Sequence, residues 1–384
     1  MSDHARLSCS AAHRWTACPG APRLEAQFPR QESIYAAEGT TAHALLETAL
    51  LLSQPLDQCL ALVPGATEVM AEALQPVVDW IQAQMAENPG AELYLERRVD
   101  PGSPLGRDDL WGTADILIFF REDRRLLVGD LKFGAGLAVE VEDNPQIRLY
   151  ALGALALADY PVEAVTLAIL QPRAPHADGP VRVATLTRSD LDAFGATIRA
   201  AAALTDEDDA PLNAGEHCKF CRAAGGCAAL ADYSLAVARE AFREVDAPLR
   251  PERIGYLLGE AETVRGWLKA LEEHALTLAR TGTEIPGWKL AQRQGNRAWI
   301  DADAALPHLA ATYGVDPDLL APRKLGTPAH VERVVKAETK QKADLAALVK
   351  VPELAPRLVP LKAPGGDVFA DAAAWFAGLE DEIA

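Results

Sequence analysis

Apolar residues in the first part of the chain follow the spacing of two helices. Residues 37–52 are predicted to be helical because apolar side chains recur on one face, at Ala42, Leu45, Leu46, Ala49 and Leu50. A second helix is predicted over residues 66–85, since Asn88-Pro89-Gly90 is a strong stop signal. The first 35 residues show no clear period.

The pattern then changes to that of a sheet. Three strands are predicted over residues 93–99, 111–120 and 125–133. The short charged turn at 121–124 predicts an antiparallel hairpin between the last two. A helix over residues 146–158, beginning at Asp143-Asn144-Pro145, and a buried strand over residues 165–170 follow. This order predicts a mixed α/β core of about 130 residues, a central sheet flanked by helices.

The rest of the chain is predicted to be mainly helical. The acidic residues 205–209 are interpreted as a solvated linker, and a long helical region follows over residues 233–281. Residues 287–300 are compatible with a hairpin, and residues 301–384 with short helices broken by prolines. The expected organisation is a core at 1–232, a helical connector at 233–281 and a C-terminal domain at 282–384.

Composition and charge narrow the class of protein. At 384 residues, 49% hydrophobic and 24% charged, the chain fits a globular protein and neither a disordered nor a collagen-like one. The net charge of -18, from 37 basic and 55 acidic residues, excludes nucleic acid binding by bulk electrostatics alone. Any DNA contact must therefore come from local patches.

Neither a membrane span nor a signal peptide is expected, because no long apolar run and no basic N-terminal segment followed by one is present. A cytoplasmic location is the corresponding prediction. In a reducing compartment the six cysteines are interpreted as metal ligands before disulfides are considered.

The predicted hairpin carries the sharpest chemical signal. Asp115 lies on one strand and Asp130 on the next, and Lys132 shares a face with Asp130 by the two-residue period. Two carboxylates on adjacent strands are typical of a site for a hard cation such as Mg²⁺, and the lysine could orient or deprotonate a water beside it. The alternative is a surface hairpin with an Asp–Lys salt bridge.

Two neighbouring segments could complete this site. His43, near the start of the first predicted helix, could be a third metal ligand, although a lone helix histidine is more often an ordinary residue. Gln146 and Tyr150 lie one turn apart on a single helix face, which could also be just an amphipathic rim.

Cys218, Cys221 and Cys227 form a Cys-x2-Cys-x5-Cys group that needs a fourth ligand. The candidates for that ligand are Cys18, Cys9, Cys59 and His217. The spacing fits either a structural Zn²⁺ or a [4Fe–4S] cluster, and free buried thiols are the alternative. A metal shared with Cys18 would close a loop of about 200 residues and staple the N-terminus to the core.

Taken together, these motifs resemble a known set. In chain order they are a Cys-Pro at Cys18, a helix histidine, Gly-x-x-Asp, Asp-x-Lys-x-Gly, Gln-x-x-x-Tyr and three cysteines. This order resembles the RecB-like branch of the PD-(D/E)XK nucleases, and specifically the iron–sulfur members found in the AddB helicase-nuclease subunit and in CRISPR-associated RecB-like exonucleases. Residues 10–47 also look similar to a phage- and prophage-encoded family of such nucleases. The resemblance covers roughly residues 5–232.

The resemblance implies a restriction-endonuclease-like core and a role for each matched residue. His43, Asp115, Asp130 and the backbone carbonyl of Leu131 would bind catalytic Mg²⁺ or Mn²⁺, and Lys132 would activate water. Gln146 and Tyr150 would hold DNA phosphate or the lysine. The [4Fe–4S] cluster would be ligated by Cys18, Cys218, Cys221 and Cys227. Phe133 departs from the family, which usually has a small hydroxyl residue there, and no nucleotide-binding helicase motif is present.

The C-terminal third adds basic residues. Basic and aromatic residues alternate here, as they do on protein surfaces that stack the bases of single-stranded nucleic acid. They are Trp288, Lys289, Arg293, Arg297 and Trp299. Between Arg323 and Lys362 nine basic residues stand against four acidic ones, a local excess of five. A solvated helix surface is the alternative for both.

The expected function is that of a metal-dependent DNA nuclease, an exonuclease serving phage recombination or DNA processing. Its partners would be DNA ends or single strands, with a recombinase, an annealing protein or a helicase, and the chain could form a homo-oligomer. Two alternatives remain: a non-catalytic accessory that binds DNA ends, and a zinc-stapled structural protein.

Overall fold

The computed structural model describes residues 5–29, 34–136, 138–241 and 250–288, with the isolated positions 307 and 311. The chain divides into two compact units, Met1–Leu290 and Ala291–Ala384, and the elements below belong to the first. The predicted hairpin at 287–300, the short helices of 301–384 and the basic stretch at 323–362 lie outside the described residues, apart from Trp288 and those two isolated positions. Trp288 is 81% exposed.

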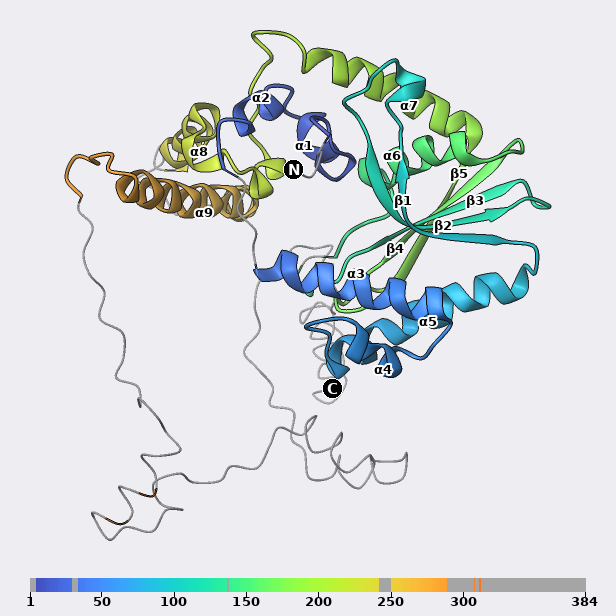
Figure 1. Cartoon of the computed structure of the whole chain (residues 1–384). Coiled ribbons are helices and arrows are strands. Elements are labelled where there is room, and N and C mark those ends of the chain that lie inside the picture. The colour runs from blue at the N-terminus through green and yellow to red at the C-terminus, as the bar shows by residue number, and fades with distance from the viewer. Residues whose placement is uncertain are drawn as a thin grey trace, which may run out of the picture. The chain divides into compact units, whose positions relative to one another are not determined.

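A five-stranded mixed sheet forms the centre of the first unit (Figure 1). Its strands, in spatial order, are β1 (Glu92–Val99), β2 (Gly112–Phe120), β3 (Arg125–Leu131), β4 (Ala164–Leu170) and β5 (Val181–Thr187). Only β3 and β4 pair in parallel, and the helix α6 (Pro145–Ala154) lies in the connection between them. The α/β class and the antiparallel hairpin β2–β3 are confirmed.

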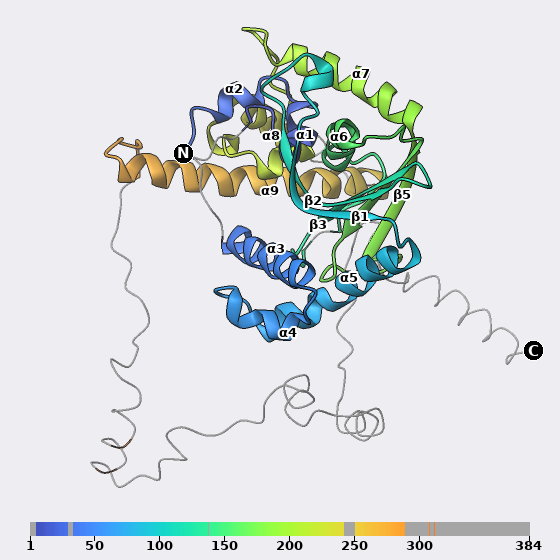
Figure 2. The same ribbon diagram turned by 45° about the vertical axis from the view of Figure 1, so that its right-hand side comes forward.

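Helices cover both faces of the sheet (Figure 2). α3 (Ile34–Leu52), α4 (Leu56–Cys59) and α5 (Glu68–Glu87) lie on one face, and α6 and α7 (Arg188–Leu204) on the other. Two apolar clusters result. The α3-side cluster includes Leu45, Leu74, Ile116, Ile118 and Leu127. The α6-side cluster includes Leu117, Val128, Ile147, Leu149 and Leu191.

Local sequence signals explain where these helices begin. The Thr67 hydroxyl accepts the N–H of Met70 at the start of α5. The Asn144 side chain accepts backbone N–H groups of the first turn of α6. Pro145 has no N–H group, so it adds no unpaired donor at the start of this helix. The predicted start of the helix at 146–158 is thus confirmed, but its last part is a separate 3-10 turn, Leu155–Leu157.

The N-terminal segment, which shows no period in sequence, folds into short helices. These are the 3-10 turn Cys9–Ala11, α1 (Ala12–Trp15) and α2 (Ala21–Glu25). Trp15 is fully buried in the α6-side cluster and donates its indole N–H to the Ser8 carbonyl. Further 3-10 turns lie at Leu60–Leu62, Ser103–Leu105, Glu216–Phe220 and Ala224–Gly226.

The interpretation of residues 205–209 as a solvated linker is confirmed for residues 206–209, which are exposed, but not for the first residue of the stretch. Thr205 is buried, and the Asp206 carboxylate pairs with Arg6 and with Arg107, the latter at 2.7 Å. These ion pairs bring together segments about 100 and 200 residues apart, a contact that local composition does not reveal.

The predicted helical region at 233–281 forms two helices, α8 (Ala228–Ala241) and α9 (Pro251–Arg280). Gly225 lies against α9, where a Cβ would be 2.2 Å from the Ala270 carbonyl oxygen, so only glycine permits this approach. None of the described helices is long and apolar enough to cross a membrane.

Two helical glycines give a test of the packing. A Cβ at Gly153 of α6 would lie 2.8 Å from the Pro101 nitrogen and 2.9 Å from the Asp100 nitrogen. Because backbone cannot move aside cheaply, Gly153→Ala should lower the free energy of unfolding by about 1–3 kcal/mol. Gly255 of α9 meets nothing within 4 Å, so Gly255→Ala should raise helix stability by about 0.5–1 kcal/mol. Urea denaturation of both variants measures the difference, and a stabilised Gly153→Ala would contradict the packing of α6.

Candidate functional site

The candidate site lies where β2 and β3 separate. Their ladder ends at the pair Ile116 and Gly129. Beyond it, the Asp115 carboxylate accepts the Leu131 N–H at 2.6 Å, in place of a strand carbonyl. The carboxylate of Asp115 is therefore fixed at the mouth of the opening, next to Asp130.

A break in the strand alternation directs Asp115 toward α3. Gly112 faces α6, since a Cβ there would meet Tyr150, and Ala114 belongs to the α6-side cluster. Ile116 belongs instead to the α3-side cluster, although positions 114 and 116 of a regular strand share a face. Asp115 and Ile116 thus project successively to the α3 side.

The same break occurs on β1 at the opposing residues. Leu95 packs on the α3-side cluster, whereas Val99 is buried in the α6-side cluster. Between them Glu96 has a left-handed backbone (φ 45°), unusual for a residue with a side chain. The register places Glu96 opposite Asp115, so both carboxylates reach the α3 side.

His43 of α3 meets these two carboxylates. Its Nδ1 lies 3.2 Å from Glu96 Oε1 and 3.7 Å from Asp115 Oδ1, and its Nε2 lies 3.1 Å from the Leu131 carbonyl oxygen. Among the described residues, His43, Glu96 and Asp115 are the one group of three or more His, Cys, Asp or Glu whose ligand atoms all lie within 4.8 Å of one another. The sequence-based site omits Glu96, which could have been noticed as an acidic residue at the centre of the predicted strand 93–99.

The remaining predicted residues form a hydrogen-bonded chain beside α6. Lys132 Nζ donates to Asp130 Oδ1 and to Gln146 Oε1, both at 3.1 Å. Gln146 Nε2 in turn donates to Asp130 Oδ1 at 2.9 Å and to the Tyr150 hydroxyl at 3.1 Å. The single amide of Gln146 therefore fixes the lysine, the carboxylate and the phenol relative to one another.

One buried oxygen of this chain has no donor. Asp130 is 2% exposed, and its Oδ2 accepts no hydrogen bond from any described residue. Lys132 Nζ is 2.8 Å from Oδ2, but outside hydrogen-bond geometry. This oxygen therefore has a cation beside it but no well-directed hydrogen bond, and it can accept a further ligand. A hard cation would satisfy it, so the residues present fit an oxygen-ligated divalent metal.

The electrostatics of the site follow from burial. Burial, followed by the charge of Asp130, raises the pKa of Asp115 to about 7. Burial alone would lower the pKa of His43, but the hydrogen bond to Glu96 and the neighbouring carboxylates outweigh it and raise that pKa. Burial and the same aspartates also raise the pKa of Tyr150, which stays a neutral phenol. Negative charge is thus in excess at the opening.

Comparison with protein families places the chain in one of them. Residues 4–364 match the family model described as "Protein of unknown function (DUF2800)", which is most of the chain. The protein belongs to the DUF2800 family. The match carries no activity, so the chemistry of this DUF2800 protein has to be argued from its own residues.

The DUF2800 chain also brings Cys18 beside the segment that carries three further cysteines. Asn213 N–H donates to the Cys18 sulfur at 3.3 Å. Arg14 of α1 donates to the Phe220 carbonyl at 3.2 Å, next to Cys221. The N-terminal segment is therefore held against the cysteine segment by direct protein contacts.

The cysteine thiols themselves are not drawn tightly together. No three of them bring their sulfurs within 4.8 Å of one another in the described part of the chain. Burial raises the pKa of Cys218, and that of Cys221 to about 12, so both are neutral thiols here. The other two cysteines, Cys9 and Cys59, are buried in the α6-side and α3-side clusters respectively.

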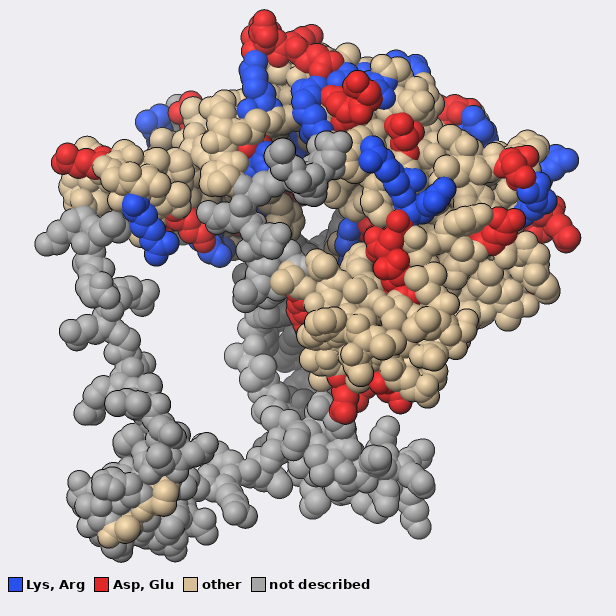
Figure 3. All heavy atoms as spheres, in the orientation of Figure 1, with Lys and Arg blue, Asp and Glu red and all other residues tan. Residues whose placement is uncertain are grey.

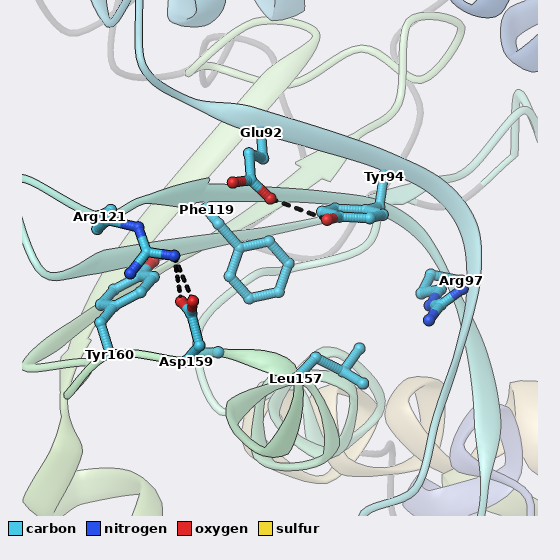
Figure 4. Close-up of a pocket in the computed structure, with 9 residues that line it drawn as sticks. Glu92, Tyr94, Arg97, Phe119, Arg121, Leu157, Asp159 and Tyr160 are labelled. Atoms are coloured by element: carbon cyan, nitrogen blue, oxygen red, sulfur yellow. Dashed lines mark hydrogen bonds and ion pairs between the residues drawn. The ribbon is translucent and has the colours of Figure 1, made fainter.

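A separate pocket of about 270 Å³ lies around the other end of β1 in this DUF2800 protein (Figure 4). Phe119 and Tyr160 line it, and an ion pair between Arg121 and Asp159 lies at one side. None of the residues of the candidate site lines this pocket. We therefore place the site by its chemistry, at the separation of β2 and β3.

The raised pKa of Asp115 predicts how stability depends on pH. The folded chain holds this proton more tightly than the unfolded chain, whose carboxyl titrates near 3.8, so Asp115 destabilises the fold as pH rises from about 4 through about 7. Asp115→Asn keeps an oxygen for the Leu131 N–H and removes the charge. In EDTA it should melt above the wild type at about pH 8, with the difference vanishing toward pH 4.

Circular dichroism melts at several pH values measure this difference. The matched control is Asp192→Asn, which removes an exposed carboxylate paired with Arg188 on α7 and should show no comparable gain at high pH. An Asp115→Asn variant that melts below the wild type at about pH 8 would show that the charge is stabilised in the metal-free chain.

Proposed function

We propose that this protein is a metal-dependent DNA nuclease of the RecB-like PD-(D/E)XK type. The observation that carries the proposal is the set of Asp115, Asp130, Lys132 and Gln146 at the opening of β2 and β3, with the donorless oxygen of Asp130 buried within it. A hairpin that only displayed a surface salt bridge would not bury two carboxylates side by side.

The metal would be held by His43 Nε2, the Leu131 carbonyl and the carboxylates of Asp115 and Asp130. In support, Nε2 and the carbonyl oxygen already lie 3.1 Å apart, so two of these donor atoms are neighbours. Glu96 accepts from Nδ1 and so orients the imidazole. When bound, Mg²⁺ or Mn²⁺ would lower the pKa of a water molecule and neutralise charge on a phosphoryl oxygen.

The protein groups around the metal would position the attacking water. Lys132 is the cation of the site that can both hold a water molecule and exchange a proton with it, and its amine is partly exposed at the opening. Gln146 fixes that amine against Asp130. The neutral hydroxyl of Tyr150 accepts a hydrogen bond from the Gln146 amide and so helps to fix its position. Phe133 is buried in the α3-side cluster and offers no hydroxyl to a phosphate.

A second metal group is proposed for the four cysteines. Cys18, Cys218, Cys221 and Cys227 would ligate a [4Fe–4S] cluster that stabilises the packing of the N-terminal segment. The contacts from Arg14 and Asn213 support it, because they already bring the two segments together. Zn²⁺ is the alternative, but a tetrahedral Zn²⁺ would need sulfurs within about 4 Å of one another.

The biological role that fits these sites is phage recombination or DNA processing, as an exonuclease acting on DNA ends or single strands. A recombinase, an annealing protein or a helicase would deliver that substrate, and the chain could work as a homo-oligomer.

Incubation with end-labelled linear and closed circular DNA, with and without Mn²⁺, tests the nuclease proposal. The wild type should degrade linear DNA only when Mn²⁺ is present. Asp130→Asn and Lys132→Ala should each lower the rate by at least about 100-fold, because each removes a group that acts on the metal or the water. Lys269→Ala, which removes an exposed lysine of α9, is the matched control and should cleave as the wild type does.

Full activity in both site variants, confirmed as folded by circular dichroism, would sink the nuclease proposal. Metal-dependent binding of DNA ends without any cleavage would instead favour the non-catalytic accessory.

Absorbance of anaerobically purified protein tests the cluster. A [4Fe–4S] group should give a brown solution with a band near about 400 nm, from iron–thiolate charge transfer. Cys221→Ala should lose the band and melt at a lower temperature, because the cluster would no longer hold the N-terminal segment. Cys59→Ala, in the α3-side cluster, should keep the band. A colourless wild type with one bound Zn²⁺ per chain would overturn the iron–sulfur assignment.

A further inference from the structure

Arg98 of β1 lies over an aromatic ring, two residues along the strand from Glu96 of the candidate site. Its guanidinium carbon is 4.0 Å from the centre of the Trp111 ring. The side chain is exposed, and no carboxylate of the described residues pairs with it. A guanidinium held over a ring by a cation–π contact keeps N–H donors that can bind a ligand.

Arg98 is one of three arginines in this part of the chain, with Arg97 and Arg125, for which the described residues supply no carboxylate partner. Carboxylates pair with Arg107, Arg121, Arg124, Arg148 and Arg173. In a chain with a net charge of -18, an arginine that has no carboxylate partner and lies two residues from Glu96 on β1 calls for a reason. The nearest acidic residue of its own strand, Glu96, is engaged with His43, and Trp111 holds the guanidinium in its stacked position.

Arg98 lies on the same side of the sheet as His43, Glu96 and Asp115, which are called the metal group here. On β2, Gly112 and Ala114 face α6, so Trp111, between the buried Leu110 and Gly112, projects to the α3 side as Asp115 does. On β1, Arg98 is two residues beyond Glu96, on the same face, and pairs with Thr113. Two residues of a strand span about 7 Å, the order of the separation between neighbouring phosphates of one nucleic acid strand.

The adjacent Arg97 provides an internal contrast. It lines the pocket of Figure 4 with Phe119, so it projects to the opposite, α6 side. Figure 3 shows Lys and Arg side chains gathered over β1, with acidic side chains beside them. Two consecutive arginines of one strand thus present the same charge to different faces, and only Arg98 shares a face with the metal group.

We propose that Arg98, held in place over the Trp111 ring, binds the backbone phosphate next to the one that lies at the metal group. The inference rests on the proposed nuclease function and deepens it. It assigns a contact that sets the register of the DNA strand on β1, and it makes Arg98 a positioning residue, since it touches the substrate away from the bond that breaks. Trp111 acts through Arg98.

Fluorescence anisotropy with a short, labelled single-stranded DNA in EDTA tests this contact without cleavage. Arg98→Ala should weaken binding about tenfold and reduce the slope of log K against log salt by about one, as expected for one lost phosphate contact. Arg98→Lys should bind with intermediate affinity, because it keeps the charge but loses the planar stack. Arg97→Ala removes the same charge one residue away and should bind as the wild type does.

Kinetics with Mn²⁺ supply a readout that misfolding would not give. Arg98→Ala should raise KM for the same DNA with little change in kcat, because the contact stabilises the bound substrate and the transition state by the same amount. Equal loss of affinity in Arg97→Ala and Arg98→Ala, unchanged binding in Arg98→Ala, or a wild type that does not bind DNA would each overturn the inference. Binding that depends on Arg98 in a wild type that never cleaves would contradict the nuclease proposal alone.

Discussion

The candidate site depends on one hydrogen bond, from the Leu131 N–H to the Asp115 carboxylate. It follows the last β2–β3 pair, Ile116 and Gly129, and links the two strands by a side chain where the backbone ladder has ended. A backbone donor at 2.6 Å fixes the carboxylate more rigidly than a mobile side chain would. The Leu131 carbonyl, on the same residue, is thereby aimed at His43.

Two sets of side chains meet across this hydrogen bond, one from each face of the sheet. His43 and Glu96 approach from the α3 side, and Lys132 and Gln146 from the α6 side. Two buried carboxylates in one place repel, as the raised pKa of Asp115 records, and Lys132 and His43 compensate part of this charge. The excess negative charge and the donorless oxygen of Asp130 are the physical basis of the metal proposal.

The rest of the unit holds this opening in place through contacts between distant segments. Buried Trp15 packs the N-terminal segment on the α6-side cluster, and the same segment contacts the cysteine turn through Arg14. Asp206 links Arg6 and Arg107 at the edge of that assembly. These contacts exist without a metal, so a cluster at the cysteines would add to an interface already formed by ion pairs and apolar burial.

The sequence by itself determined four of the five strands, the hairpin and the helix that begins at Asn144, because alternation, turn chemistry and capping are local signals. It did not predict β5 or the helix α7 that follows it. It also indicated Asp115, Asp130 and Lys132 as one group, since neighbouring strands of a hairpin must pair. Only the tertiary structure decided that Glu96 meets His43 and that Arg98 shares their face. Both depend on a break in the alternation of paired strands and on contacts across tens of residues, and neither leaves a period in the sequence.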